Sequence, residues 1–106
     1  MNKNLKNKFD EVIDSWETEI MYHSSWRVME SKPQFKTLVE MGKDVIPLIL
    51  ERIRQTPYFH LSMLMCAVVG NYPEYKPPVE NGFAKFDVQS FGDSWIEWGK
   101  ANDYIS

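Results

Sequence analysis

The chain has 106 residues, of which 43% are apolar and 25% are charged, and its formal net charge at pH 7 is −3. This length and composition are typical of one globular domain with a stable hydrophobic core, and they exclude an intrinsically disordered chain. The mild negative charge argues against nucleic acid or an anionic membrane surface as the main partner. We therefore expect residues 1–106 to form a single domain.

Cys66 is the only cysteine, which excludes an internal disulfide and fits a reducing compartment. It lies in the apolar segment LSMLMCAVVG, and this position predicts a small core residue rather than a nucleophile. The segment has about half the length that a membrane-spanning helix needs, and no signal-peptide pattern is present. We expect a cytoplasmic protein that has no membrane partner.

Apolar residues recur at helical spacing between Leu5 and Ile20, which predicts an amphipathic first helix. Its opposite side, expected to face solvent, carries the carboxylates of Asp10, Glu11, Asp14 and Glu17.

The pattern loosens in the segment YHSSWRVMESKP, where a break between helices is expected. Ser24 or Ser25 could cap a short helix that carries Trp26. Ser31 is then expected to cap a third helix, with Pro33 tolerated in its first turn.

The segment MGKDVIPLIL is predicted to join two helices. Gly42 follows the last periodic residue of one helix and is expected to end it in a left-handed conformation. Asp44 is expected to cap the next helix, which places Pro47 in the first turn, where its missing N–H has no intrahelical partner. That helix continues through VIPLILERIRQ, with Glu51, Arg52 and Arg54 on its solvated face.

The segment PYFHLSMLMCAVVG, ending at Gly70, is apolar on nearly every side and is predicted to be a central helix covered on several sides. The Pro-rich segment NYPEYKPPVENG is expected to form an ordered surface loop or an extended strap. A last helix follows, with Asp87 as its cap and Gly99 as its stop. Gly92 within it is expected to allow close approach of another backbone.

These elements predict an all-α fold, a compact bundle of about five helices with a Pro-rich loop before the last one. The segment TLVEMGKDVIPLILERI (Thr37–Ile53) resembles one helix–turn–helix unit of the HEAT-like repeat proteins. The wider layout MG…IPLIL…W..WG, which ends at Trp95, Trp98 and Gly99, resembles a group of small uncharacterised bacterial proteins, some carried on mobile elements. The resemblance implies a shared fold with a helical hairpin, and it brings no activity and no catalytic residue.

Candidate chemistry centres on His23 and His60, which could approach each other and bind a metal together with Glu30 or Asp14. A helix-terminal or partly buried position is the alternative interpretation of each histidine. Ser24 beside His23 could form a nucleophile and base, but no Gly-x-Ser-x-Gly elbow is present. We assign no catalytic, cofactor-binding or metal-binding residue.

The aromatic content of four Trp, five Tyr and six Phe is the more informative feature. Core packing uses many of these side chains, but those in or beside the Pro-rich segment are candidates for contact with another protein. Stacking of nucleic-acid bases is the rival interpretation, and the nearby Lys76 and Lys85 are opposed by three carboxylates. The predicted partner-binding residues are Tyr72, Tyr75, Phe83, Trp95 and Trp98.

The sequence therefore predicts a non-enzymatic protein–protein interaction module without a cofactor, with homo-oligomers left open. Its contact surface is expected to be these aromatic residues or the acidic face of the first helix. The resemblance to mobile-element proteins implies an inhibitor or accessory protein of a toxin–antitoxin, phage-defence or counter-defence system. The alternatives are a small metal-dependent hydrolase that uses His23 and His60, and a weak nucleic-acid-binding protein that uses the N-terminal lysines.

Overall fold

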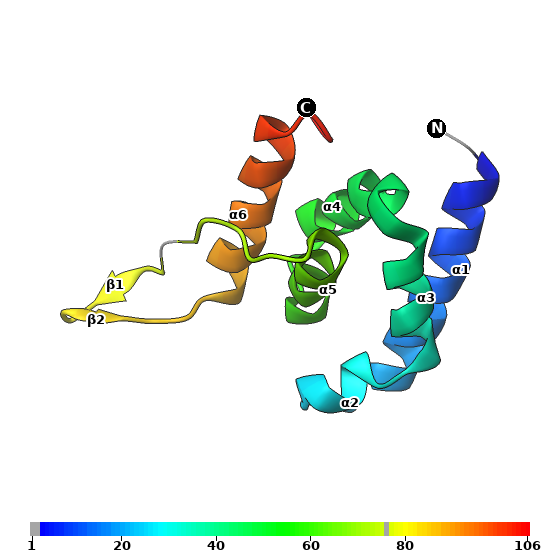
Figure 1. The fold of residues 1–106 in the computed structure, drawn as a ribbon. Coiled ribbons are helices and arrows are strands. Elements are labelled where there is room, and N and C mark those ends of the chain that lie inside the picture. The colour runs from blue at the N-terminus through cyan, green and yellow to red at the C-terminus, as the bar shows by residue number, and fades with distance from the viewer. Residues whose placement is uncertain (1–2, 76) are drawn as a thin grey trace.

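The computed structural model of the chain describes residues 3–75 and 77–106, most of which belong to α-helices (Figure 1). The helices are α1 (Lys3–Ile20), α2 (Trp26–Glu30), α3 (Pro33–Met41), α4 (Ile46–Gln55), α5 (Phe59–Val69) and α6 (Val88–Ala101). A 3-10 turn, η1 (Gly42–Val45), joins α3 to α4, and a two-stranded antiparallel hairpin of β1 (Val79–Glu80) and β2 (Phe83–Ala84) precedes α6. The all-α bundle confirms the predicted fold class.

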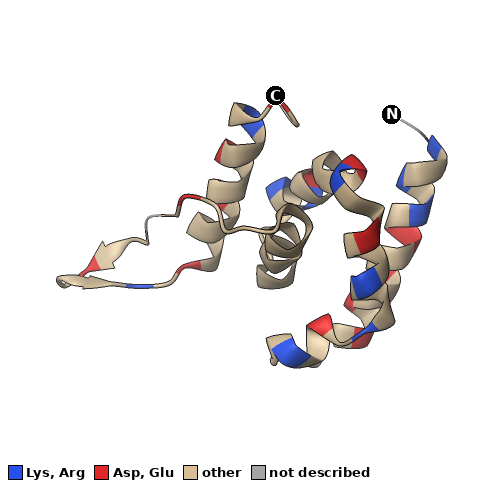
Figure 2. Cartoon of the chain, viewed as in Figure 1, with Lys and Arg blue, Asp and Glu red and all other residues tan. Residues whose placement is uncertain are grey.

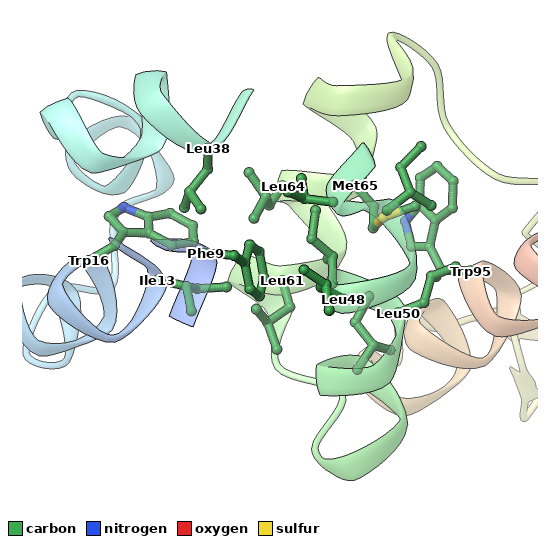
Figure 3. Packing of buried hydrophobic residues seen from close by; sticks show 14 of the residues in the cluster. Phe9, Ile13, Trp16, Leu38, Leu48, Leu50, Leu61, Leu64, Met65 and Trp95 are labelled. Atoms are coloured by element: carbon green, nitrogen blue, oxygen red, sulfur yellow. The ribbon is translucent and has the colours of Figure 1, made fainter. Parts of the chain in front are cut away.

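Helix α5 lies at the centre of the bundle and packs against α3, α4 and α6, while α1 packs against α3 (Figure 1). The core contains side chains from each of these helices. Figure 3 shows Phe9 and Ile13 of α1 and Leu61 and Leu64 of α5 lying close together in this cluster. All four are at most 2% exposed. The predicted central position of the apolar helix is therefore confirmed.

The turn between α3 and α4 confirms two sequence predictions and corrects two others. Gly42 ends α3 as predicted, but its φ of 72° and ψ of −153° lie outside the expected left-handed helical region, in a conformation that glycine adopts without steric cost. Pro47 lies in the first turn of α4, as predicted. Asp44 was expected to cap α4, but it lies inside η1, and the N-cap position belongs to Val45, which is fully buried. A buried apolar residue, without a side-chain capping bond, therefore stands at the start of α4.

The helix–turn–helix unit over Thr37–Ile53 is present, but its two helices make their main contacts elsewhere. Helix α3 packs chiefly on α1 and α5, whereas α4 packs chiefly on α5 and α6. The unit therefore joins the side of the bundle that contains α1 to the side that contains α6, and both of its helices contact α5.

The start of α3 also differs from the sequence prediction. Lys32, not Ser31, occupies the N-cap position, and Pro33 is the first helical residue. The Ser31 hydroxyl donates a hydrogen bond of 2.6 Å to the Val28 carbonyl, so this side chain closes the end of α2. Ser25 precedes α2 as predicted, without a side-chain capping bond.

Helix α6 begins at the predicted cap, because the Asp87 carboxylate accepts a hydrogen bond of 3.0 Å from the Ser90 amide. Gly99 was expected to end the helix, but α6 continues past it to Ala101. A Cβ at Gly99 would lie 2.5 Å from Leu50 Cδ1, so this glycine allows close packing of α6 on α4. At Gly92 a Cβ would lie 2.6 Å from Pro57 Cβ, which confirms the predicted close approach.

Helix α5 ends at Gly70, as predicted, and this glycine is in the left-handed conformation with φ 81°. Residues 71–75, which we call the strap, then run toward the hairpin. The hairpin turns at Asn81 and Gly82, whose φ values of 53° and 83° are those of a type I′ turn. An ordered surface loop or an extended strap was predicted here, and the strands were not. In Figure 1 the hairpin projects away from the helices.

Candidate functional site

The predicted partner-binding residues divide between the surface and the core. Tyr72 in the strap is 69% exposed and Phe83 in the hairpin is 77% exposed, so both side chains are accessible. Trp95 is fully buried, which corrects its prediction as a contact residue. The aromatic residues that recur at helical spacing in α6 lie on the side of the helix that packs against α4 and α5, and they do not form a stripe on the surface.

Tyr75 and Trp98 are partly buried and have structural contacts. The Tyr75 hydroxyl donates to the Asp87 carbonyl at 3.2 Å and accepts from the Asp87 amide at 3.0 Å. These bonds fix the strap to the start of α6. Trp98 stacks on Tyr104, with ring centroids 5.3 Å apart. The surface around Tyr72 therefore has an ordered support, although only two of the five predicted residues are strongly exposed.

Helix α5 has one side that the rest of the chain covers incompletely. Leu61, Leu64 and Met65 are buried, whereas Phe59 and Met63, one turn apart, are only partly buried. The partly buried side continues through Cys66 and Ala67 to Gly70. No charged residue occurs in α5, as Figure 2 shows. An apolar helix is therefore left with a half-covered face.

Two hollows adjoin this face of α5. The first, with a volume of about 450 Å³, is lined by Trp26, Glu30, Phe35, Met63, Cys66, Ala67, Gly70, Asn71 and Tyr72. The second, with a volume of about 360 Å³, is lined by Phe59, Met63, Tyr72, Pro73, Tyr75, Phe86 and Phe91. Because Met63 and Tyr72 line both hollows, we treat them as one feature and call it the α5 groove.

Aromatic rings that contact one another form the walls of the α5 groove. Trp26 and Phe35 meet edge to face at 5.3 Å between centroids, and Trp26 meets Phe59 at 6.4 Å. Phe59 in turn meets Phe86 at 5.9 Å, and Phe86 meets Phe91 at 5.6 Å. Each ring restrains its neighbour, so the groove is ordered before any partner binds.

Cys66 lines the α5 groove and is half-buried, which is more accessible than the core position predicted from its apolar neighbours. Burial raises the pKa of its thiol to about 11. The thiol therefore stays protonated at neutral pH, and Cys66 contributes an apolar surface rather than a nucleophile.

A separate hollow lies where the end of α1 meets the start of α5, with a volume of about 640 Å³. It is lined by both His23 and His60, whose approach was hypothesised from the sequence, and by Asp14. Glu30, the other hypothesised metal ligand, does not line it. Instead, His60 Nε2 lies 2.6 Å from Glu17 Oε2. Within residues 3–75 and 77–106, no three His, Cys, Asp or Glu side chains form a group that could hold a metal ion.

Arg52 joins the acidic side of α1 to α4. Its guanidinium donates to Asp14 at 2.9 Å, to Asp10 at 3.1 Å and to Glu17 at 3.4 Å. Burial acts to lower the pKa of Arg52, but the bonds to Asp14 and Asp10 outweigh it and raise this pKa. Both Arg52 and these carboxylates were predicted to face solvent. The Asp14 side chain does so, at 62% exposed, whereas those of Asp10, Glu17 and Arg52 are partly buried, at 32%, 26% and 26% exposed.

Comparisons of the chain with protein-family models, with curated proteins and with solved structures give no significant match. None of the helices in the described part of the chain combines the length and the apolar character needed to span a bilayer.

Proposed function

We propose that this chain is a non-catalytic protein-binding module, and that the α5 groove and the neighbouring hairpin form its contact surface. The observation that carries the proposal is the half-covered apolar face of α5, which ordered aromatic side chains border on both sides. Aromatic side chains in preformed hollows are the groups that contribute most to protein–protein affinity.

The exposed apolar residues of the strap and hairpin extend this surface. Tyr72, Val79, Phe83 and Phe86 are all more than half exposed, with exposed fractions of 69%, 70%, 77% and 53%. Phe83 pairs with Glu80 across the hairpin, so it has no apolar cover from the opposite strand. Burial of an aromatic side chain of this kind at the centre of an interface contributes about 2 kcal/mol or more.

The proposal is tested by affinity capture from a lysate of the native host, followed by quantification of the proteins that are recovered in a stoichiometric amount. The test variant combines Tyr72→Ala and Phe83→Ala. Both side chains are exposed, so their removal leaves the core intact. The matched control is Tyr22→Ala, because Tyr22 is a 91% exposed aromatic residue that lies in the turn after α1.

We expect the wild-type chain and the Tyr22 variant to retain the same partner and the double variant to lose it. Equal recovery by all three chains, or no stoichiometric partner with any of them, would refute the proposed contact surface. The resemblance to mobile-element proteins adds a finer proposal, an inhibitor or accessory role in a toxin–antitoxin or phage-defence system. In that case the partner is expected to be encoded beside this chain.

A further inference from the structure

The one charged side chain that lines the α5 groove, within the described part of the chain, is a carboxylate. Among the described residues, no Lys or Arg lines either half of the groove, whereas Glu30 lines the half beside α2. Glu30 is exposed, and its carboxylate has no hydrogen bond or ion pair with any described residue. An apolar surface with an uncompensated carboxylate at its edge favours a partner with positive charge.

A further hollow next to the groove is also lined by carboxylates and by no Lys or Arg of the described residues. It has a volume of about 390 Å³ and is lined by Glu74 of the strap and by Ser90, Asp93, Ser94 and Glu97 along one side of α6. Since Glu74 lies between two strap residues that line the α5 groove, this hollow adjoins the groove. Lys100, at 3.7 Å from Glu97, is the one cation paired with these carboxylates within the described part of the chain.

The negative charge is also distributed unequally along the sequence. Residues 1–55 contain nine acidic and nine basic residues and are neutral, whereas residues 56–106 contain six acidic residues and three lysines. The net charge of −3 therefore belongs to the half of the chain that contains α5, the strap, the hairpin and α6. Figure 2 shows acidic residues on the hairpin and along α6, with a basic residue after the hairpin and another near the end of α6.

The shape of the groove indicates the kind of segment that fits it. Its floor is one side of α5, an 11-residue helix about 16 Å long, bordered by α2 and α3 on one side and by the strap on the other. A groove floored by a helix and walled by aromatic rings suits the apolar stripe of another helix. The strap and the acidic side of α6 lie where the polar side of that helix could place its charges.

We infer that the α5 groove binds an amphipathic helix of a partner protein whose polar side carries Lys and Arg. This inference rests on the proposed protein-binding function and names the chemistry of the partner. Three other occupants fit the observations less well. Nucleic acid and anionic lipid would bring negative charge to Glu30, Glu74 and Asp93. In a two-fold symmetric dimer that uses this face, both copies would bring carboxylates and neither would bring a cation from the described lining of the groove.

The test is site-specific photo-crosslinking in the native host, followed by mass spectrometry of the adducts. A photo-reactive phenylalanine analogue replaces Tyr72, which lines both halves of the groove, and in a matched control it replaces Tyr22. We expect an adduct at position 72, and not at position 22, with a protein segment of net positive charge. That segment should have apolar residues at helical spacing.

Each other outcome overturns a defined part of the account. A protein adduct at position 72 through an acidic or neutral segment overturns the inference and leaves the proposed function intact. An adduct with nucleic acid, lipid or a second copy of the chain also overturns the inference. Absence of any protein adduct at position 72, together with unchanged capture by the Tyr72 and Phe83 double variant, overturns the proposed function as well.

A charge reversal gives an independent readout with the captured partner. The variant Glu30→Lys with Glu74→Lys is compared with Glu11→Lys with Glu40→Lys, which changes the net charge equally at exposed positions on α1 and α3. We expect the first variant to bind about tenfold more weakly and to lose most of its salt dependence, whereas the second binds as the wild type does. Equal affinities of the two variants would contradict a basic partner.

Discussion

Gly92 tests how tightly α6 is held against the start of α5. An alanine Cβ at this position would lie 2.6 Å from Pro57 Cβ and 3.2 Å from Ile53 Cγ2. Because Pro57 Cβ belongs to a rigid ring, it cannot rotate away, and relief requires that α6 shift. Such overpacking costs about 1–3 kcal/mol, whereas alanine gains about 1 kcal/mol over glycine in helix propensity. The close contact places the cost in the upper part of that range, so we expect Gly92→Ala to destabilise the fold by about 1–2 kcal/mol.

The assay is equilibrium unfolding in urea, with Gly99→Ala as the matched control. At Gly99 the clash is with Leu50 Cδ1, the end of a flexible side chain, at 2.5 Å. The overpacking cost is therefore smaller at Gly99, while the gain in helix propensity from alanine is the same. We expect Gly99→Ala to lower the free energy of unfolding by less than Gly92→Ala does. A Gly92→Ala chain as stable as the wild type would show that Pro57 and α6 are not in this contact.

Three further predictions concern Arg52, Asp10 and Cys66. Arg52→Ala should lower the free energy of unfolding by about 1–2 kcal/mol in urea, because three α1 carboxylates lose their shared cation; an unchanged value would contradict this role. Hydrogen bonds from Lys6 and Arg52 lower the pKa of Asp10, so its stabilising effect is present above about pH 4 and is lost below it. The free energy of unfolding of the wild type should therefore fall more steeply through that pH than that of Asp10→Asn, and parallel curves would refute the contact. Cys66, with a pKa of about 11, should react with iodoacetamide roughly 100-fold more slowly than a free cysteine at about pH 8, and a rate equal to that of the urea-unfolded chain would argue against its burial.

Helices α1 and α4 were predictable from their apolar period, and α3, α4 and α5 also from a Gly or Pro at one or both ends. The cap residues were less predictable. Asp44 and Ser31 have the right chemistry for caps, but burial of Val45 and the bond from Ser31 to Val28 give those segments better alternatives. A side-chain cap stabilises a helix by about 1 kcal/mol. Burial of one core side chain contributes more than that, so packing can override the capping preference.

The hairpin was missed because its strands are two residues long, too short to show alternation. The adjacent Asn81 and Gly82 were the available signal, since this pair favours a type I′ turn. Contacts between distant residues had no local signal at all. Nothing near Arg52 in the sequence indicates that it would meet Asp10, 42 positions earlier, because the folding of α4 against α1 creates that contact.

The candidate site was predicted in part. Aromatic content and the apolar character of α5 indicated an interaction surface, and Tyr72 and Phe83 are accessible. Trp95 was misassigned because periodicity identifies a stripe but does not tell whether the chain or a partner covers it. The half-covered face of α5 becomes visible only when the neighbouring helices are in place.

Hydrogen exchange of the chain with and without its captured partner tests the central claim most directly. If the α5 groove and the hairpin are the contact surface, backbone amides of residues 71–75 and 79–84 exchange more slowly in the complex, while those of α1 are unchanged. Slower exchange confined to α1, with the strap and hairpin unaffected, would place the partner on the opposite side of the bundle and contradict the account.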